Sequence, residues 1–397
     1  MSESLCQGLR VRVARSMTEI DGARWDACAN PPGEPEHPLV SHDFLSALER
    51  SGSATARTGW QGHHLLLEDE GRQLLGAAPC YLKSHSRGEY VFDWGWADAY
   101  ERAGGRYYPK LQLSVPFTPV TGPRLLVPRG PEQAMNRRRI AAAAAELCAQ
   151  IGASSAHITF PTEAEWTELG CHGWLRRTDT QFHWHNRVYR TFEEFLGALA
   201  SRKRKNIRKE RETVRAAGIS FEWLTGADLK EHHWDSFFAF YLETGSRKWG
   251  SPYLTRSFFS LIGETMAERT LLVLAKRAGR PISGALNFIG SDALYGRNWG
   301  AIEHHEFLHF ETCYYQAIEF AIARGLKRVE AGAQGPHKLA RGYMPETTYS
   351  LHHLADPRLA RAVADYLERE RRAVAEDSRF LAEHSPFRRD RAEAEEF

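Results

Sequence analysis

The sequence predicts an α/β protein with mixed sheets, built as two related halves followed by a charged C-terminal helix. The pattern G-R-x-x-x-G-A occurs at 71–77 and again at 279–285. The pattern Y-x-x-x-W-G likewise occurs at 90–95 and at 295–300. Motifs that return in the same order over such a distance are typical of a duplicated domain rather than of a short-repeat solenoid.

An alanine-rich helix that ends at glycine and leads into a strand is expected in each half. The first runs through AAAAAELCAQIG into ASSAHITF, and the second runs through YYQAIEFAIARG into LKRVEAG. Glycine directly after a helix is the expected left-handed cap. Short β-branched or aromatic runs between glycine turns predict the strands, so each half should follow the order β-α-β-β-β-α-β.

The expected boundaries are residues 10–187 for the first half, 188–357 for the second half and 358–397 for the C-terminal helix and tail. The apolar positions of that last helix are few, which predicts a solvated surface helix.

The composition is that of an ordinary globular protein, with 397 residues, 42% hydrophobic and 26% charged. A net charge of +2 excludes a chain that binds polyanions over its whole surface, so any attraction to phosphate must be local. The six cysteines form no C-x-x-C pair, which argues against structural zinc and a disulfide framework. With no apolar run of the roughly 18 residues that a span needs, and no signal-peptide core, we expect a cytoplasmic protein.

One short stretch, SRKRKNIRKER, concentrates positive charge, with seven cationic side chains in the ten residues 202–211. Thr191 and Glu194 form a capping-box pattern that predicts a helix from Phe192 to about Ala217. Arginines 204, 208, 211 and 215 should then share one face, although like charges at this spacing cost a few tenths of a kcal/mol each.

We interpret this helix as a phosphate-binding surface, and its candidate contacts are Lys203, Arg204, Lys205 and Arg208. The alternative is a solvated helix face without a ligand. A membrane-binding helix would show a bulkier aromatic face. No motif indicates sequence-specific DNA binding.

The densest group of polar residues follows the strand RVEAG in the second half. Glu330 should lie at the carboxyl end of that strand, where ligands gather in α/β sheets. The segment after it supplies an amide, a base, two cations and a hydroxyl, namely Gln334, His337, Lys338, Arg341 and Tyr343. A neighbouring strand adds Arg297 and Trp299, and the next helix adds His309 and Glu311. Such a set could deprotonate an amine and stabilise an oxyanion, as acyl transfer requires.

Other interpretations of these residues stay open. Glu330 could serve only as a structural ion-pair partner. The histidine doublets resemble metal ligands, but adjacent strand residues face opposite ways, and we expect no metal site. The sequence contains no G-x-S-x-G, Walker or G-x-G-x-x-G motif for a hydrolase, ATPase or dinucleotide enzyme.

Long runs of the sequence carry a family likeness. They include HPLVSHDFLSALERSGS, YLKSHSRGEYVFDWGWADAYERAGGRYYPKLQLSVPFTPVTGPRLL, GSRKWGSPYLTRSFF, GALNFIGSDALYGRNWG and VEAGAQGPHKLARGY. These runs resemble the FemAB-like predicted N-acyltransferases of the GNAT superfamily over nearly the whole chain. The resemblance implies two tandem GNAT-like domains with a site in the cleft between or beside them.

FemAB-type enzymes move an amino acid from aminoacyl-tRNA to an amine of a peptidoglycan precursor. The resemblance therefore implies an N-acyltransferase whose donor is aminoacyl-tRNA or an acyl thioester such as acyl-CoA, with no tightly bound cofactor. Two departures from the pattern occur. The GNAT pyrophosphate loop is replaced by GAIEHHEFLHFE, and Leu339-Ala340 stands where FemAB-type loops carry phenylalanine and lysine. Lys338 or Arg341 is the candidate to replace that lysine.

A second function, from another class, is a non-catalytic protein with a degenerate acyltransferase fold that recognises a cell-wall precursor or RNA. The missing pyrophosphate loop favours it, and the titratable residues after Glu330 oppose it. The sequence decides neither the acceptor nor the oligomeric state.

Overall fold

The computed structural model describes residues 8–248, 252–332 and 335–388. Contacts divide the described chain into two units. Unit 1 holds residues 8–179, 253–262 and 347–375, and unit 2 holds the rest. The expected boundaries at 187 and 357 differ from this division, because 253–262 and the first part of the C-terminal helix belong to unit 1. The assignment of 10–187 and 188–357 as duplicated domains stays a prediction.

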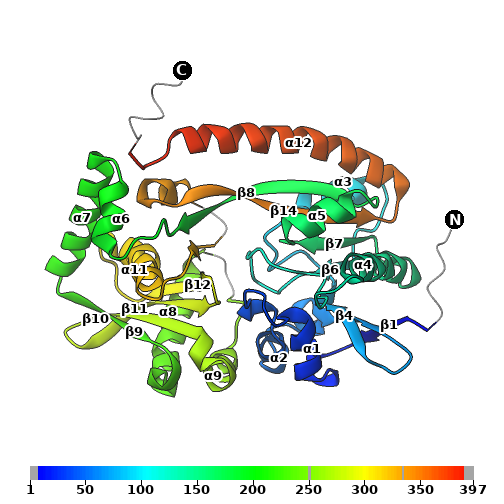
Figure 1. The fold of residues 1–397 in the computed structure, drawn as a ribbon, viewed down its shortest axis with the longest axis horizontal. Helices are drawn as coiled ribbons and strands as arrows, with labels where there is room; N and C mark the ends of the chain where they lie inside the picture. Colours follow the sequence, from blue (N-terminus) through cyan, green and yellow to red (C-terminus); the bar gives the residue numbers. More distant parts are fainter. Residues whose placement is uncertain (1–7, 249–251, 333–334, 389–397) are drawn as a thin grey trace. The chain divides into compact units, whose positions relative to one another are not determined.

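Unit 1 contains two sheets (Figure 1). The smaller sheet is antiparallel, in the order β1-β3-β4, and the larger one follows the order β2-β5-β6-β7-β14. Only β6 and β7 pair in parallel among these neighbours. The strands are β1 (Arg10–Ala14), β2 (Trp60–Gly62), β3 (His64–Glu68), β4 (Leu74–Ala78), β5 (Cys80–Lys83), β6 (Lys110–Leu113) and β7 (Ser155–Thr159).

Helix α4 crosses over between the parallel strands β6 and β7 and buries Ile140 and Ala144 against this sheet's core. Its last residues are followed by a turn into β7, as the alanine-rich pattern predicts. The helices of unit 1 are α1 (Gly22–Ala29), α2 (His42–Arg50), α3 (Trp94–Arg102), α4 (Gln133–Gln150) and α5 (Glu163–Gly170), with short 3-10 turns at Met17–Glu19, Pro38–Val40 and Ala56–Thr58.

Unit 2 is built on one mixed sheet in the order β8-β13-β12-β11-β10-β9. As in unit 1, one neighbouring pair is parallel, β12 with β13, and the alanine-rich helix connects the two strands. The strands are β9 (Ile219–Leu224), β10 (Thr270–Arg277), β11 (Arg280–Ile289), β12 (Ala293–Ala301) and β13 (Arg328–Glu330). Two longer strands, β8 (Leu175–His185) and β14 (Met344–Leu354), pass from one unit to the other.

Helices surround the sheet of unit 2 (Figure 1), where α8 contacts β11 and β12 and α11 contacts β12 and β13. The helices are α6 (Phe192–Ala198), α7 (Ser201–Ala216), α8 (Glu231–Lys248), α10 (Leu308–Phe310), the π-helix η6 (Glu311–Tyr315) and α11 (Gln316–Ala323). Short 3-10 helices occupy Gly226–Asp228, Ala267–Arg269 and, as η7, Pro336–Arg341. Helices α9 (Arg256–Thr265) and α12 (Pro357–Glu383) belong to both units.

One of the two repeated motifs marks equivalent structure, and the other does not. The G-R-x-x-x-G-A motif spans the turn and second strand of a hairpin in both places, β3–β4 and β10–β11. By contrast, Trp94 and Gly95 begin helix α3, whereas Trp299 and Gly300 lie inside β12. The second repeat is therefore wrong as a structural equivalence.

The expected single helix from Phe192 to Ala217 is broken into α6 and α7. Leu199 has an extended backbone, with a ψ of 152°. A second chain segment explains the break, because the Ala200 amide donates to the Pro386 carbonyl at 2.9 Å and the Arg388 amide donates to the Ala198 carbonyl at 3.0 Å. Backbone groups that would have bonded within a helix find partners across this contact instead.

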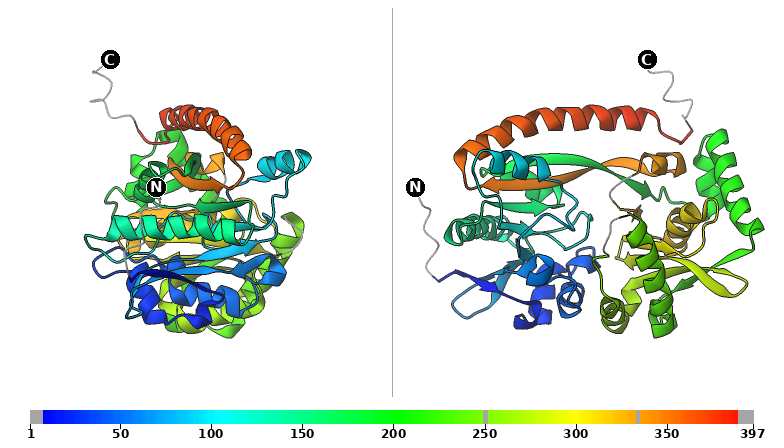
Figure 2. Two further views of the ribbon diagram at one scale, coloured as in Figure 1. Left: turned by 90° about the vertical axis from the view of Figure 1, so that its right-hand side faces the viewer. Right: turned by 180° about the vertical axis from the view of Figure 1, so that it is seen from behind.

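The C-terminal helix α12 is continuous (Figure 2) and most of its residues are exposed as expected, but one face of its first half is buried. Leu359, Val363 and Leu367 are buried in a cluster with Trp96 and Tyr107. Their spacing of four residues places them on one face of the helix, so a few apolar positions are enough to dock it.

Candidate functional site

Strands β12 and β13 separate where the polar residues of the second half gather. They pair only from Ala293–Arg328 to Tyr295–Glu330, whereas β12 continues to Ala301. At Gly296 a Cβ atom would lie 3.2 Å from the carbonyl oxygen of Glu330, a tight contact that glycine avoids where the two strands approach closely. Arg297 is the additional residue of a β-bulge. The carboxyl end of β13 therefore lies beside the part of β12 that carries Arg297 and Trp299.

Glu330, at the end of β13, is 2% exposed and paired. Its Oε1 accepts a hydrogen bond from Arg328 Nε at 3.0 Å, and its Oε2 lies 3.9 Å from His183 Nε2 without a hydrogen bond. Burial lowers the pKa of His183. No hydrogen bond or ion pair in the described part of the chain joins Glu330 to Lys338.

Lys338, on η7, is a buried cation whose charge is not cancelled. Its side chain is almost fully enclosed, and its Nζ donates to the carbonyl oxygen of Gly332 at 2.8 Å. No carboxylate in the described residues pairs with it. Burial lowers the pKa of Lys338 to about 8, and Cys313 acts in the opposite direction.

A line of polar side chains in hydrogen-bond contact begins at His337, the residue before Lys338 on η7. His337 Nε2 lies 2.9 Å from the hydroxyl of Tyr314, and this hydroxyl lies 3.3 Å from His309 Nε2. The other ring nitrogen of His309, Nδ1, lies 3.5 Å from Cys313 Sγ. Trp299 packs edge-on against His309, with ring centroids 4.7 Å apart. Burial, together with the charges of Arg341 and Lys338, lowers the pKa of His337.

Tyr343, the last residue of the segment, has a fully buried hydroxyl that finds no hydrogen-bond partner in the described part of the chain. Its ring centroid lies 5.5 Å from that of Tyr314, and burial raises its pKa well above the ordinary value. We call the following residues the Lys338 cluster: His309, Cys313, Tyr314, His337, Lys338 and Tyr343. His337 is exposed and His309 and Cys313 are partly exposed, whereas the other three are buried.

Arg341 does not carry a free charge into this cluster. Its guanidinium forms a bidentate ion pair with Glu210 of α7, at 2.7 and 3.2 Å. The same side chain donates to the carbonyl of His337 at 2.8 Å and stacks over Phe310, 3.4 Å from the ring centroid. Glu210 also accepts from the hydroxyl of Tyr315. Arg341 therefore ties the loop of His337 to the basic helix.

The cations of α7 divide into two groups. Arg211 is buried, and its guanidinium bonds Glu311 at 2.9 Å and Glu319 at 2.7 Å, so it is a structural residue and not part of an open basic face. Arg208 pairs on the surface with Glu193 at 2.6 Å. The remaining cations have no carboxylate partner within the described residues, namely Arg202, Lys203, Arg204, Lys205, Lys209 and Arg215.

The structure thus brings together His337, Lys338 and Tyr343 from the predicted set, with Trp299 in contact with His309. It does not join Glu330 to them, and it gives Arg341 and Glu311 other partners. Gln334 lies outside the described residues. The phosphate candidates Lys203, Arg204, Lys205 and Arg208 lie on α7 and do not contact the Lys338 cluster through any hydrogen bond or ion pair of the described chain.

Sequence reasoning missed Cys313, Tyr314 and Glu210. Residues 309 and 314 are five apart, which places them on different faces of an α-helix but one turn apart in a π-helix. The π-helix at Glu311–Tyr315 creates their contact, and no spacing rule applied to the sequence signals it.

A second buried polar network lies in unit 1, and the sequence did not single it out. Lys110 Nζ donates to Glu89 Oε2 at 2.7 Å and also bonds Asp93. Lys83 lies 3.5 Å above the Trp60 ring, and burial lowers its pKa to about 7. All five side chains are less than a tenth exposed, so this network is internal.

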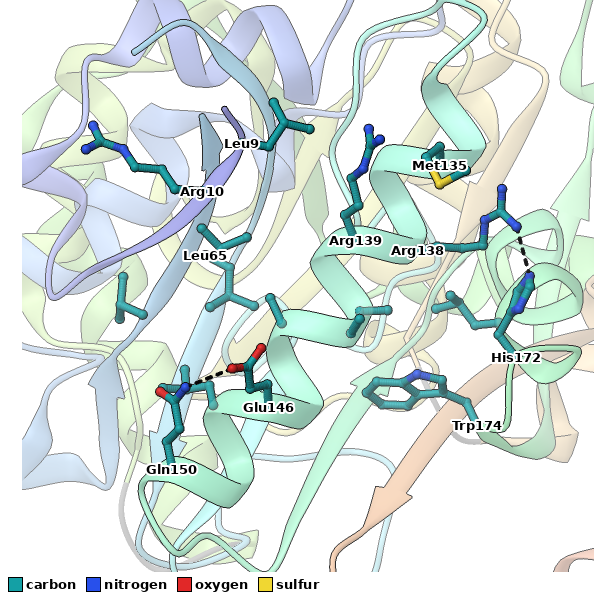
Figure 3. Close-up of a pocket in the computed structure, with 17 residues that line it drawn as sticks. Leu9, Arg10, Leu65, Met135, Arg138, Arg139, Glu146, Gln150, His172 and Trp174 are labelled. Carbon is teal, nitrogen blue, oxygen red and sulfur yellow. Dashed lines mark hydrogen bonds between the residues drawn. The ribbon is translucent and has the colours of Figure 1, made fainter. Parts of the chain in front are cut away.

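An open groove of about 1000 Å³ also belongs to unit 1, between α4 and the strands β1 and β3 (Figure 3). None of the predicted site residues lines it. Its arginines 10, 138 and 139 are paired with glutamates at 3.2, 3.7 and 3.3 Å, so their charges are largely balanced.

Two features of the described residues bear on the class of site. They contain no group of three or more histidine, cysteine or acidic side chains placed to hold a metal ion. No helix within these residues combines the length and the apolar character that crossing a membrane requires.

Comparison with solved structures shows the fold. FemX matches with a TM-score of 0.55 at 12% identity, over 87% of this chain and 98% of FemX. L-PGS from Bacillus licheniformis matches with a TM-score of 0.50 at 9% identity, over 85% of this chain and 98% of L-PGS. The C-terminal domain of a putative lysylphosphatidylglycerol synthetase from Agrobacterium fabrum also matches with a TM-score of 0.50, at 8% identity. This match covers 88% of this chain and 96% of that domain. The likeness confirms the predicted mixed α/β fold, which the chain shares with FemX, L-PGS and the Agrobacterium fabrum domain.

None of the curated proteins compared with the chain matches its sequence significantly. The profile of one family does match, over residues 16–389, and that family is described by peptidoglycan biosynthesis and recognition. The match covers both units and includes all the runs on which the resemblance rests. The chain belongs to the FemAB-like family.

Proposed function

We propose that the chain transfers an acyl or aminoacyl group from an activated donor to an amine, and that the Lys338 cluster is the site of transfer. The donor would be an aminoacyl-tRNA or an acyl thioester, used as a cosubstrate and not held as a resident cofactor. The family's description favours an amine of a peptidoglycan precursor as the acceptor.

The uncancelled charge of Lys338 carries this proposal. When an amine attacks an ester or thioester, negative charge develops on the carbonyl oxygen, and a fixed cation in a dry environment stabilises it. Lys338 is 1% exposed, and the hydrogen bond that its side chain forms within the described residues is to a neutral carbonyl. Arg341, the other predicted cation, is already neutralised by Glu210 and acts instead on the shape of the loop.

His337 is the proposed general base for the acceptor amine. Its imidazole is exposed at the edge of the cluster, and the lowered pKa keeps it neutral near pH 7, so it can accept a proton. Glu330 is the other candidate base among the predicted site residues. Its pairing with Arg328 and its burial beside His183 favour a structural role.

The unpaired cations Lys203, Arg204 and Lys205 of α7, together with Arg208, are the proposed contacts for the phosphates of the donor. Arg208 would exchange its exposed pairing with Glu193, a type of ion pair that contributes little to stability. Arg297, Trp299 and Gln334 complete the proposed set of substrate contacts.

A transfer assay tests this function. Purified full-length protein is supplied with radiolabelled aminoacyl-tRNA or acyl-CoA and with a UDP-linked muramyl pentapeptide, and label in the pentapeptide is followed by chromatography and mass spectrometry. We expect transfer by the wild-type protein and a loss of about 100-fold or more in Lys338→Ala, the cost of removing one oxyanion donor. The exposed Lys327→Ala variant is the matched control and should keep full activity.

Binding of the pentapeptide or tRNA without any turnover would contradict the transferase proposal. It would support the alternative of a recognition protein with a degenerate acyltransferase fold.

A further inference from the structure

Cys313 differs from the other cysteines in the described chain. Cys28, Cys80 and Cys148 are buried, and burial raises the pKa of Cys28 to about 12 and that of Cys148 to about 11. Cys171 is exposed and has no hydrogen-bonded base. Cys313 alone among these five combines partial exposure with an imidazole nitrogen within reach, His309 Nδ1 at 3.5 Å. A thiol and a base in such contact is the arrangement of an activated nucleophile.

The hydrogen bonds around His309 are consistent with a single direction of proton transfer. If the Cys313 thiol donates to His309 Nδ1, then His309 Nε2 carries the ring proton and donates to the Tyr314 hydroxyl. The Tyr314 hydroxyl is then free to donate to His337 Nε2. His309 and Tyr314 each accept once and donate once within this line, so its three contacts fit one consistent set of donors from Cys313 to His337.

Two further observations point to a ligand at this cysteine. The charge of Lys338 acts on Cys313, and a cation beside a thiol favours the thiolate. Among the described residues the hydroxyl of Tyr343 is fully buried and has no hydrogen-bond partner, and after burial itself Tyr314 and Cys313 are the groups that raise its pKa most. An orphaned buried donor beside a nucleophile is a ready contact for the oxygen of an acyl group.

We propose that Cys313 is a catalytic nucleophile that carries the transferred group as a thioester. In the first step its sulfur attacks the donor carbonyl, a C–S bond forms and the bond from that carbonyl to the donor's oxygen or sulfur breaks. The proton that His309 takes from the thiol goes to this leaving atom.

In the second step the acceptor amine attacks the thioester, a C–N bond forms and the C–S bond breaks. In this two-step route His309, which is neutral again after the first step, takes the proton lost by the amine and returns it to the sulfur, the role that a one-step transfer would give to His337. The reaction needs no oxidant, reductant or further reactant. This inference rests on the proposed function, since it divides that transfer into two steps.

Alkylation provides the first test, and it needs neither the donor nor the acceptor. The wild-type protein is treated with iodoacetamide at pH 7, and the modification of each cysteine is followed by peptide mass spectrometry. We expect Cys313 to react on the order of tenfold faster than the exposed Cys171, because thiolate fraction controls the rate. In His309→Gln this advantage should disappear, whereas Cys171 should react at an unchanged rate. Equal rates at the two cysteines in the wild-type protein would overturn the proposal.

Acylation tests the covalent step itself. With p-nitrophenyl acetate as the probe, we expect a burst of about one p-nitrophenolate per chain and an acetyl group on Cys313 that hydroxylamine removes. Cys171→Ala should retain the burst and Cys313→Ser should lose it.

The two proposals fail in distinguishable ways. If Cys313→Ser is folded and transfers label to the pentapeptide at the wild-type rate, the thioester is excluded and the transferase function stands. If Cys313 is acylated but the wild-type protein transfers nothing to any amine, the proposed function fails and the nucleophile remains.

Discussion

At the scale of single residues, the Lys338 cluster shows the usual conflict between stability and chemistry. A buried ammonium without a carboxylate partner costs free energy, and the lowered pKa of Lys338 is the measure of that cost. Arg211 in the same unit shows the alternative, since it is equally enclosed but held between two glutamates. The chain keeps one buried cation satisfied and leaves the other available, which is expected where the free charge has a function.

The free-energy cost of burying the Lys338 ammonium predicts a specific dependence of stability on pH. Its pKa is about 8 in the folded chain, below the ordinary 10.5, so between these values only the unfolded state keeps the proton. The free energy of unfolding should therefore rise with pH across this window. Lys338→Met should remove that rise and stabilise the protein at pH 7 by about 1–3 kcal/mol.

Urea unfolding of both proteins at pH 7 and near pH 10 measures this difference, with Lys327→Met as the exposed control. Lys83 in unit 1 adds a rise of the same sign, so the comparison between variant and wild type is the informative quantity. If the free energy of unfolding changes equally with pH in Lys338→Met and in the wild type, the assigned cost of the buried ammonium is wrong.

At the scale of elements, helix α7 combines an inner side that holds the fold and an outer side that carries charge. Ile207, Arg211 and Val214 are buried, whereas Arg202, Lys205 and Lys209 are exposed. Glu210 lies between the two sides and binds Arg341 of the loop that carries His337 and Lys338. The helix therefore connects a cationic surface directly to the proposed site.

Salt dependence tests the outer side of α7. Each phosphate contact with a single-stranded nucleic acid contributes about −0.7 to the slope of log K against log salt. Changing Lys203, Lys205 and Lys209 to Glu should reduce the slope for tRNA by about 2, measured by fluorescence anisotropy from about 50 to 200 mM salt. Arg361→Glu on α12 is the control and should leave the slope unchanged. An unaltered slope in the triple variant would exclude the phosphate role.

The break between α6 and α7 gives a second prediction at this scale. Phe387 is 9% exposed and packs with Phe195 in the core of unit 2, beside the backbone contacts that replace the missing helical bonds. Phe387→Ala should lower the free energy of unfolding by about 2–4 kcal/mol. Phe380→Ala, a change of the same kind at a side chain that is 61% exposed, should cost less than about 0.5 kcal/mol. Thermal or urea unfolding measures both losses, and equal losses of stability in the two variants would contradict the proposed role of Phe387.

At the scale of the whole molecule, local patterns in the sequence predicted the elements whose causes are local. The hairpins at Gly71 and Gly279 and the two alanine-rich helices followed by strands all form as expected. The helix break at Leu199 was missed because its cause, the segment 386–388, lies far along the chain. The contact of Tyr314 with His309 was missed because it depends on a π-helix, which no residue spacing announces.

For the candidate site too, the sequence predicted the local features and not the contacts between distant segments. The strand end at Glu330 and the residues after it were identified from the sequence, since polar residues after a strand are a local feature. Their pairings were not, because Glu210, which neutralises Arg341, and Arg328, which holds Glu330, are decided by tertiary contacts.

Whether Lys338 stabilises the oxyanion is best measured by the pH dependence of transfer, compared between the wild-type protein and Lys338→Arg. If the buried ammonium of Lys338 stabilises the oxyanion, kcat of the wild type falls as this group loses its proton near pH 8. Lys338→Arg keeps its charge at every accessible pH, so its remaining activity should show no such fall. A falling limb at the same pH in both proteins, or full transfer by Lys338→Ala, would contradict the account.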